Sequence, residues 1–155
     1  MTEAEWRAFA NAGTRTGKIA VTRKDGRPHV TPVWFLIDDG DGDEAGGGGG
    51  GGGGTGPRVV FNTGLSSLKG RALSRDPRFA LCVDDQEPPY SFVLLECTAE
   101  LVEDPVALQN WATRLGVRYM GEKRGPEFGA RNAVPGECLV FGRVDRVTAQ
   151  ARLTE

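Results

Sequence analysis

The sequence consists mainly of short apolar runs with the length of β-strands, separated by turn-forming residues. The first run, Gly17–Arg23, is followed by an Asp-Gly pair within residues 24–27, which is typical of a tight hairpin turn. The other strand-like runs are His29–Ile37, Val59–Phe61, Phe79–Val83, Ser91–Val102 and Glu137–Ala149. Because no strand–helix–strand alternation is present, a doubly wound parallel sheet is disfavoured. We therefore predict a mainly β fold, a β-barrel or meandering sheet of six or so antiparallel strands with two to four added helices.

The run His29–Ile37 is expected to form one strand covered on both sides. Its two faces are both apolar, with Val33, Phe35 and Ile37 on one and Val30, Trp34 and Leu36 on the other.

Capping residues mark two of the predicted helices. Thr2 and Glu5 have the spacing of a capping box, in which each side chain bonds to the backbone of the other residue. Asp104 followed by Pro105 is typical of an N-cap and a first helical position, and Gly121 is a plausible end of that second helix.

Residues 38–57 form a long connection that contains nine consecutive glycines, Gly46–Gly54. Loops of this length without secondary structure are uncommon inside compact domains. The run also lacks the Lys-Ser/Thr pair and the helix that a phosphate loop needs. We predict a single domain over residues 1–155 with a disordered Gly-rich hairpin loop at residues 40–56.

Composition excludes several classes of function. The formal net charge of −2 argues against a general nucleic-acid binder. No apolar run reaches the roughly 20 residues of a membrane span, and residues 1–20 lack the pattern of a signal peptide. We expect a cytoplasmic protein without nucleic-acid or membrane partners.

The reactive side chains form no recognisable catalytic set. Cys82, Cys97 and Cys138 lie far apart and are expected to be buried free thiols, and the single histidine, His29, gives no support for a metal site. Ser66 and its neighbour Ser67 lie outside any Gly-x-Ser-x-Gly elbow, so a hydrolase is disfavoured. The catalytic residues stay unassigned, and we expect a cofactor to carry the chemistry.

Residues 61–78 predict a strand, a turn and a short helix over Leu68–Arg75 that Asp76-Pro77 ends. Hydroxyl groups and free backbone N–H groups gather at the start of this helix beside Lys69 and Arg71, which favours a phosphate site. Lys69 and Arg71 would not share a helix face, whereas Ser67 and Arg71 would. An ordinary capped surface helix is the alternative, and these residues alone do not distinguish the two.

Several short motifs also occur in a characteristic order. They are Gly17–Arg23, Asp25–Pro28, His29–Trp34, Phe61–Gly64, Ser67–Arg71, Asp76–Arg78 and Glu96–Glu100. In this order the chain resembles the pyridoxamine-phosphate-oxidase-like (PPOX class) split β-barrel proteins, which are FMN-binding-like in fold. It resembles most the branch that uses the deazaflavin coenzyme F420. The resemblance covers nearly all of residues 5–149 apart from the glycine insertion.

The resemblance implies a homodimer with two cofactor sites at the subunit interface. It also implies three groups of cofactor-binding residues. The backbone of Thr31, Pro32, Val33 and Trp34 would lie along the tricyclic ring, while Thr63, Ser66, Ser67, Lys69 and Arg71 would hold the phosphate and the acidic tail, and Tyr90 and Phe92 would line the site from the partner subunit. Residues 118–121 occur near the tail in similar proteins.

The chain differs from the pattern of this family at two places that bear on the cofactor and on the reaction. The chain ends without the tryptophan and spaced arginines that hold the substrate in oxidases of pyridoxamine phosphate. Leu68 stands where FMN-binding relatives often carry a basic residue. We therefore expect an F420-dependent oxidoreductase that transfers a hydride from the reduced coenzyme to an unidentified small unsaturated substrate. The alternatives are an FMN-binding oxidase or reductase and a non-catalytic cofactor- or haem-binding protein, with His29 as the only imidazole.

Overall fold

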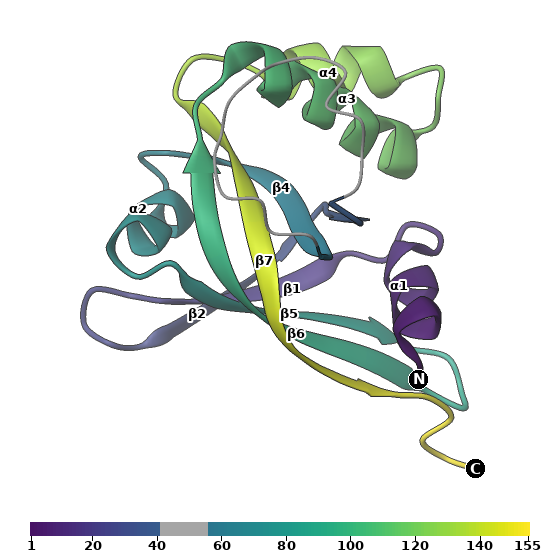
Figure 1. Cartoon of the computed structure of the whole chain (residues 1–155). Coiled ribbons are helices and arrows are strands. Elements are labelled where there is room, and N and C mark those ends of the chain that lie inside the picture. The colour runs from purple at the N-terminus through teal and green to yellow at the C-terminus, as the bar shows by residue number, and fades with distance from the viewer. Residues whose placement is uncertain (41–55) are drawn as a thin grey trace.

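The computed structural model of the chain describes residues 1–40 and 56–155. The described residues form one seven-stranded sheet with helices packed around it (Figure 1). The glycine-rich loop predicted at residues 40–56 lies outside the described residues except for its two end positions. Within the described ranges, no helix is long and apolar enough to cross a membrane.

All neighbouring strands are antiparallel, and their spatial order is β2-β1-β5-β6-β7-β4-β3. The strands are β1 (Gly17–Thr22), β2 (Pro28–Val33), β3 (Leu36–Asp38), β4 (Arg58–Gly64), β5 (Arg78–Asp85), β6 (Ser91–Val102) and β7 (Glu137–Gln150). The helices are α1 (Glu3–Asn11), α2 (Leu68–Arg75), α3 (Pro105–Met120) and α4 (Gly125–Asn132). The prediction of a mainly β, antiparallel fold is confirmed.

The capping signals in the sequence are confirmed as helix starts. Both hydrogen bonds of the capping box between Thr2 and Glu5 are present at α1. The Asp104 carboxylate accepts from the first backbone amides of α3, and this helix ends at Gly121. The turn between β1 and β2 has Gly26 at a φ of 88°, a conformation that glycine adopts without steric cost. Local sequence therefore sets these boundaries.

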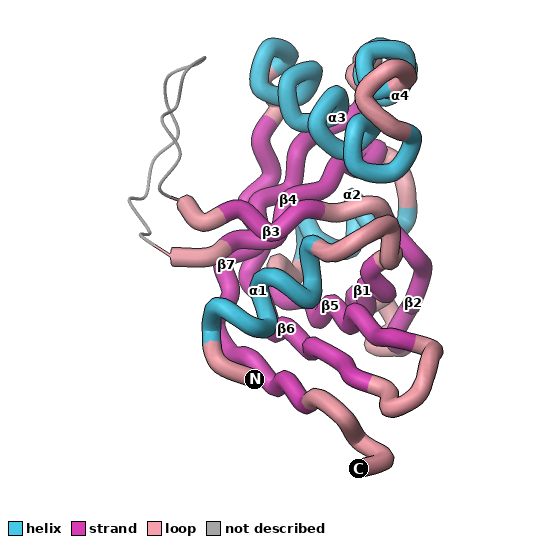
Figure 2. Tube along the Cα trace, turned by 90° about the vertical axis from the view of Figure 1, so that its right-hand side faces the viewer, coloured by secondary structure: helices cyan, strands magenta, loops and turns pink. Residues whose placement is uncertain are grey.

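The prediction of one strand over His29–Ile37 is wrong, because the chain breaks at Trp34 and Phe35. β2 pairs with β1 and β3 pairs with β4, so the two strands form opposite edges of the sheet. Two residues connect these edges, and the sheet must curl into a half-barrel to bring them together (Figure 2). The prediction that both faces are covered is also wrong for Val30, which is 59% exposed.

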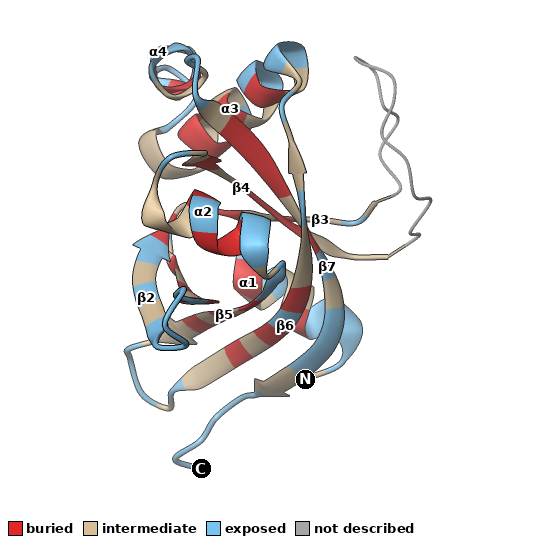
Figure 3. Ribbon diagram, turned by 90° about the vertical axis from the view of Figure 1, so that its left-hand side faces the viewer, coloured by how far each residue is buried: buried red, intermediate tan, exposed pale blue. Residues whose placement is uncertain are grey.

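Helices α1 and α2 cover the inner face of the curled sheet. Trp6 of α1 and Leu73 of α2 belong to one buried cluster with Phe35 and Phe61. Figure 3 shows buried segments on both helices and on the strands behind them. Helix α3 packs on β4 and β7 at the other end of the sheet, and α4 packs on α3. The core therefore lies between the sheet and two helices whose starts are set by local caps.

The three cysteines are free thiols, as predicted. Cys97 and Cys138 are buried, whereas Cys82 is only half-buried. Burial raises the pKa of Cys97 to about 12 and that of Cys138 to about 11. Both buried thiols therefore stay protonated near neutral pH.

Candidate anion and cofactor site

The junction between β4 and α2 is held by two hydroxyl groups. Ser67 Oγ donates to the Gly64 carbonyl oxygen at 2.6 Å and accepts from the Gly70 amide at 3.1 Å. Thr63 Oγ1 lies 3.2 Å from Ser67 Oγ and acts as the donor, because the Ser67 proton is already directed at Gly64. This network fixes the start of α2 relative to the sheet. A direct contact of Thr63 or Ser67 with an anion stays a prediction.

Gly70 allows α2 to lie directly on this junction. A Cβ atom at position 70 would lie 2.2 Å from the Gly64 carbonyl oxygen and 2.9 Å from Leu65 Cα, both of which are backbone atoms. Real Cβ atoms do not approach other atoms this closely. The close approach leaves the first free amides of α2 in a defined position.

The Lys69 side chain extends from α2 toward β2. Its Nζ atom donates to Thr31 Oγ1 at 2.9 Å, and burial lowers the pKa of Lys69. None of the described carboxylates forms a hydrogen bond or ion pair with this ammonium group. A half-buried charge with a neutral partner is incompletely compensated, and a bound anion would supply the missing opposite charge.

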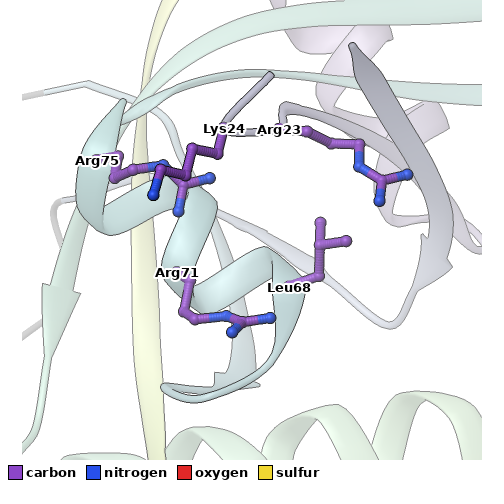
Figure 4. A pocket seen from close by; sticks show the side chains of 5 residues that line it. All are labelled: Arg23, Lys24, Leu68, Arg71 and Arg75. Atoms are coloured by element: carbon purple, nitrogen blue, oxygen red, sulfur yellow. The ribbon is translucent and has the colours of Figure 1, made fainter. Parts of the chain in front are cut away.

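A second group of cations lies on another side of α2. The side chains of Leu68, Arg71 and Arg75 follow one helix face and, with Arg23 and Lys24 of the β1–β2 turn, surround a hollow of about 380 Å³ (Figure 4). We call these five residues the cationic hollow. Among the described residues, no carboxylate is paired with any of its four cations.

Of the four cations in the cationic hollow, Arg71 was predicted from the sequence, whereas Arg23, Lys24 and Arg75 were not. The spacing of Arg71 and Arg75, four residues apart, was a usable signal that they share a helix face. No comparable signal connects the β1–β2 turn to a helix more than forty residues later. Only the packing of α2 against β1 brings these two cationic segments together.

The four residues of the predicted ring-binding segment, 31–34, differ in how far they are exposed. Pro32 is exposed, whereas Val33 is buried. The Trp34 ring stacks on Tyr119 with centroids 5.1 Å apart and an interplanar angle of 6°, and it also contacts Phe128. The Trp34 ring is therefore packed against α3 and α4, whereas Pro32 lies open to the surface. Contact with a ring stays a prediction.

The remaining predicted residues are not brought together within one chain. Ser66 is exposed in the turn before α2. Tyr90 and Phe92 belong to the β5–β6 hairpin, which lies at the opposite end of the molecule from α2 (Figure 1). The Tyr90 carbonyl oxygen accepts from the Leu153 amide. Their role in a site formed with a partner subunit stays a prediction.

Arg118 and Tyr119 hold the break between β2 and β3. The Arg118 guanidinium donates to the carbonyl oxygens of Phe35 at 2.6 Å, Ala10 at 2.8 Å and Gly13 at 3.1 Å. The Tyr119 hydroxyl accepts from the Phe35 amide at 3.2 Å. Burial lowers the pKa of Arg118 and raises that of Tyr119. These groups join α3 to the sheet, and their contact with a cofactor tail stays a prediction.

Comparison with known proteins supports the assignment that the fold suggests. The family model described as pyridoxamine 5'-phosphate oxidase matches residues 2–139. The chain therefore belongs to the pyridoxamine 5'-phosphate oxidase family, which contains oxidoreductases. No curated protein matches the chain.

Several solved structures share the fold. A conserved hypothetical protein from Mycobacterium tuberculosis is 27% identical with a TM-score of 0.76, and the match covers 98% of this chain and 86% of that one. A protein described as an F420 reductase is 21% identical with a TM-score of 0.64, covering 91% and 94% of the two chains. A haem-binding protein from Mycobacterium smegmatis is 18% identical with a TM-score of 0.64, covering 100% and 56%. These matches confirm the split-barrel fold.

Proposed function

We propose that the protein is a coenzyme F420-dependent reductase. The observation that carries this proposal is the hydrogen bond between Lys69 and Thr31. Lys69 lies at the helix start that is expected to hold the cofactor phosphate. Thr31 lies on the strand that is expected to run along the cofactor ring. The incompletely compensated charge of Lys69 fits an anionic group at this position. The similarity in fold to an F420 reductase and the leucine at position 68 also support this cofactor.

The residues of the site would bind and orient the cofactor. Lys69 would hold an anionic group, and the first amides of α2 would add hydrogen bonds to it. Trp34, held between α3 and α4, would keep the backbone of Thr31 and Val33 in place beside the ring. When bound, the reduced coenzyme supplies a hydride to an unsaturated substrate.

Binding of FMN by the same residues is the second candidate. Lys69 and Thr31 would suit the single phosphate of FMN as well as that of F420, and a FAD-binding protein from Mesorhizobium loti shares the fold at 16% identity and a TM-score of 0.62. Titrating the purified protein with each cofactor, followed by fluorescence quenching and anisotropy, separates the two. Micromolar FMN binding without any response to F420 would reject the proposal.

Substitution of Lys69 by alanine tests the position of the site. We expect weaker F420 binding by about 1.5–3 kcal/mol, the usual contribution of a hydrogen bond to a charged group. Burial lowers the pKa of Lys69, so as the pH is raised Lys69 loses its charge earlier than a fully exposed lysine would. The affinity of the wild-type protein for F420 should therefore begin to fall at a correspondingly lower pH. Lys123→Ala is the matched control, since Lys123 is exposed on the α3–α4 connection. Equal affinities of the two variants would place the phosphate elsewhere.

We further propose that two copies of the chain associate through the outer face of β1, β2, β5 and β6. Val30 lies opposite Ala20, and Ala20 lies opposite Ala80. Leu94 and Phe92 of β6 lie half-buried on the same face. The core residues of α1 and α2 pack on the inner face of these strands. This outer surface, on which the apolar residues lie beside the Lys18–Asp84 ion pair, is therefore left for a partner.

Substitution of Val30 by aspartate tests this surface. Wild-type protein should elute in size-exclusion chromatography with light scattering at twice the mass of one chain, and Val30→Asp should be a monomer, because a charge would be desolvated in the interface. Val106→Asp is the matched control, since Val106 on α3 is also 59% exposed. A monomeric wild type, or a dimeric Val30→Asp variant, would contradict the proposal.

A further inference from the structure

Glu137, the first residue of β7, brings a carboxylate to the junction between β4 and α2. Glu137 is paired with Gly64 in the sheet, so the two residues stand side by side at the end of β4. One carboxylate oxygen, Oε2, accepts from Asn62 Nδ2 at 3.3 Å. The backbone is fixed at the same place, because the Leu65 amide donates to the Gly136 carbonyl oxygen at 2.8 Å. The carboxylate is therefore held at the junction by both a side chain and the backbone.

The second oxygen of this carboxylate lies close to the start of α2. A Cβ atom at position 64 would lie 3.5 Å from Glu137 Oε1 and 3.8 Å from the Cβ atom of Ser67. Because residue 64 is a glycine, no side chain separates the carboxylate from Ser67, which is the N-cap residue of α2. Among the described residues, Oε1 has no hydrogen-bond partner. A negative charge is therefore directed toward the helix start.

The charges at this helix start are balanced, one positive against one negative. Lys69 supplies an ammonium group that no described carboxylate pairs with, and Glu137 supplies a carboxylate that no described cation pairs with. Leu68 adds no charge, and Arg71 lines the cationic hollow instead. Lys69 would neutralise a bound group that carries one negative charge. A second negative charge on the same group would find no further cation and would be repelled by Glu137.

This balance distinguishes two kinds of phosphate group. A phosphate monoester, as in FMN, carries a charge of about −1.5 to −2 at pH 7, because its second pKa is near 6. A phosphodiester carries a single negative charge, because the second ester bond replaces the second ionisable hydroxyl group. The phosphate of F420 is a diester, since it joins the deazaflavin side chain to the acidic tail. The charges at the start of α2 therefore suit a diester better than a monoester.

We propose that Glu137 is a specificity-determining residue, which disfavours a phosphate monoester relative to a phosphodiester at the start of α2. Its carboxylate repels the second charge of the monoester, and Asn62 positions that carboxylate. A repulsive element against the wrong ligand is a common source of specificity. The inference rests on the proposed function for the position of the phosphate at Lys69, and it adds the residue that selects the form of the phosphate.

Substitution of Glu137 by glutamine tests this role. Glutamine keeps the size of the side chain and an acceptor for Asn62, and it removes the charge. The ligands are FMN and its phosphate methyl ester, which has the same flavin and the same side chain but a diester. Because electrostatic repulsion grows with the charge of the ligand, we expect Glu137→Gln to bind FMN about tenfold more tightly than wild type and the methyl ester only about threefold more tightly. Fluorescence quenching and anisotropy of the flavin measure both affinities.

The comparison of the two ligands separates a charge effect from a change in packing. A carboxylate that only supports the fold would change both affinities by the same factor. Equal factors for FMN and its methyl ester would therefore overturn the proposal, and so would unchanged or weaker binding of FMN by Glu137→Gln.

Three further variants control for the side chain and for the fold. Glu137→Ser is a second neutral replacement and should repeat the unequal gains of Glu137→Gln. Glu137→Asp keeps the negative charge and should bind both ligands within about twofold of wild type. Glu122→Gln removes an exposed carboxylate on the α3–α4 connection and should leave both affinities unchanged. Unequal gains of the same size in Glu137→Asp or Glu122→Gln would contradict a role of the charge at position 137.

Titration with F420 separates this inference from the proposed function. If F420 binds to the wild-type protein and Glu137→Gln gains equally for FMN and its methyl ester, the proposed function stands and the role of Glu137 fails. If F420 does not bind while FMN and its methyl ester bind with the expected unequal gains, the role of Glu137 stands and the proposed function fails. Binding of none of the three ligands would reject both proposals.

Discussion

Replacement of Gly70 by alanine is expected to destabilise the protein by about 3 kcal/mol, at the upper end of the usual cost of overpacking. The new Cβ would collide with the carbonyl oxygen of Gly64 and the Cα atom of Leu65. Both are backbone atoms, so no side-chain rotation relieves the contact. Helix propensity alone predicts the opposite sign, a stabilisation of about 1 kcal/mol, because Gly70 lies inside α2. The sign of the change therefore distinguishes packing from propensity.

Urea unfolding followed by far-UV circular dichroism measures this effect. Arg71→Ala is the control, because Arg71 is the next residue of the same helix and is exposed, and its substitution should change stability by less than about 0.5 kcal/mol. Gly70→Ala should also weaken F420 binding, since α2 must move away from the junction at Ser67. A more stable Gly70→Ala protein would show that α2 does not lie on β4 as closely as the structure describes.

The second large effect is expected for Arg118→Ala, with a loss of about 2–4 kcal/mol for several hydrogen bonds made by one partly buried cation. The guanidinium joins three carbonyl oxygens from α1, the loop after it and the β2–β3 break. Its removal takes one donor from each of these three acceptors where α3 meets the sheet, and the Tyr119 hydroxyl still lies 3.3 Å from the Phe35 carbonyl oxygen. The Trp34–Tyr119 stack lies beside the same break, so its packing should loosen as well.

Urea unfolding and near-UV circular dichroism of the tryptophans measure these two consequences of Arg118→Ala. Arg114→Ala, one turn earlier on α3, is the matched control. Arg114 is exposed and lies over the Trp111 ring, a contact that contributes about 0.5–1 kcal/mol. Arg118→Lys should be intermediate, since an ammonium group cannot reach three carbonyl oxygens as a guanidinium does. Equal stability of the variants at positions 114 and 118 would refute the role of Arg118 as a clamp.

Local signals in the sequence were sufficient for most secondary structure. The cap at Thr2, the Asp104-Pro105 pair and the Asp-Gly turn each act within a few residues, and the structure confirms all three. The single strand over residues 29–37 was predicted incorrectly because the feature that divides it is not local. Its apolar pattern continues through Trp34 and Phe35, whereas the break there results from pairing with two distant strands, β1 and β4. An alternating pattern contains no information about such partners.

In the candidate site, too, neighbouring residues determine some features and contacts between distant segments determine others. The sequence was enough to predict α2, its N-cap region and the cations Lys69 and Arg71, because a helix start depends on neighbouring residues. The contact of Lys69 with Thr31 and the gathering of Arg23 and Lys24 around α2 depend on the curling of the sheet, which brings separate segments together. Local chemistry thus identified a helix suited to an anion, and long-range strand pairing determined which other cations surround it.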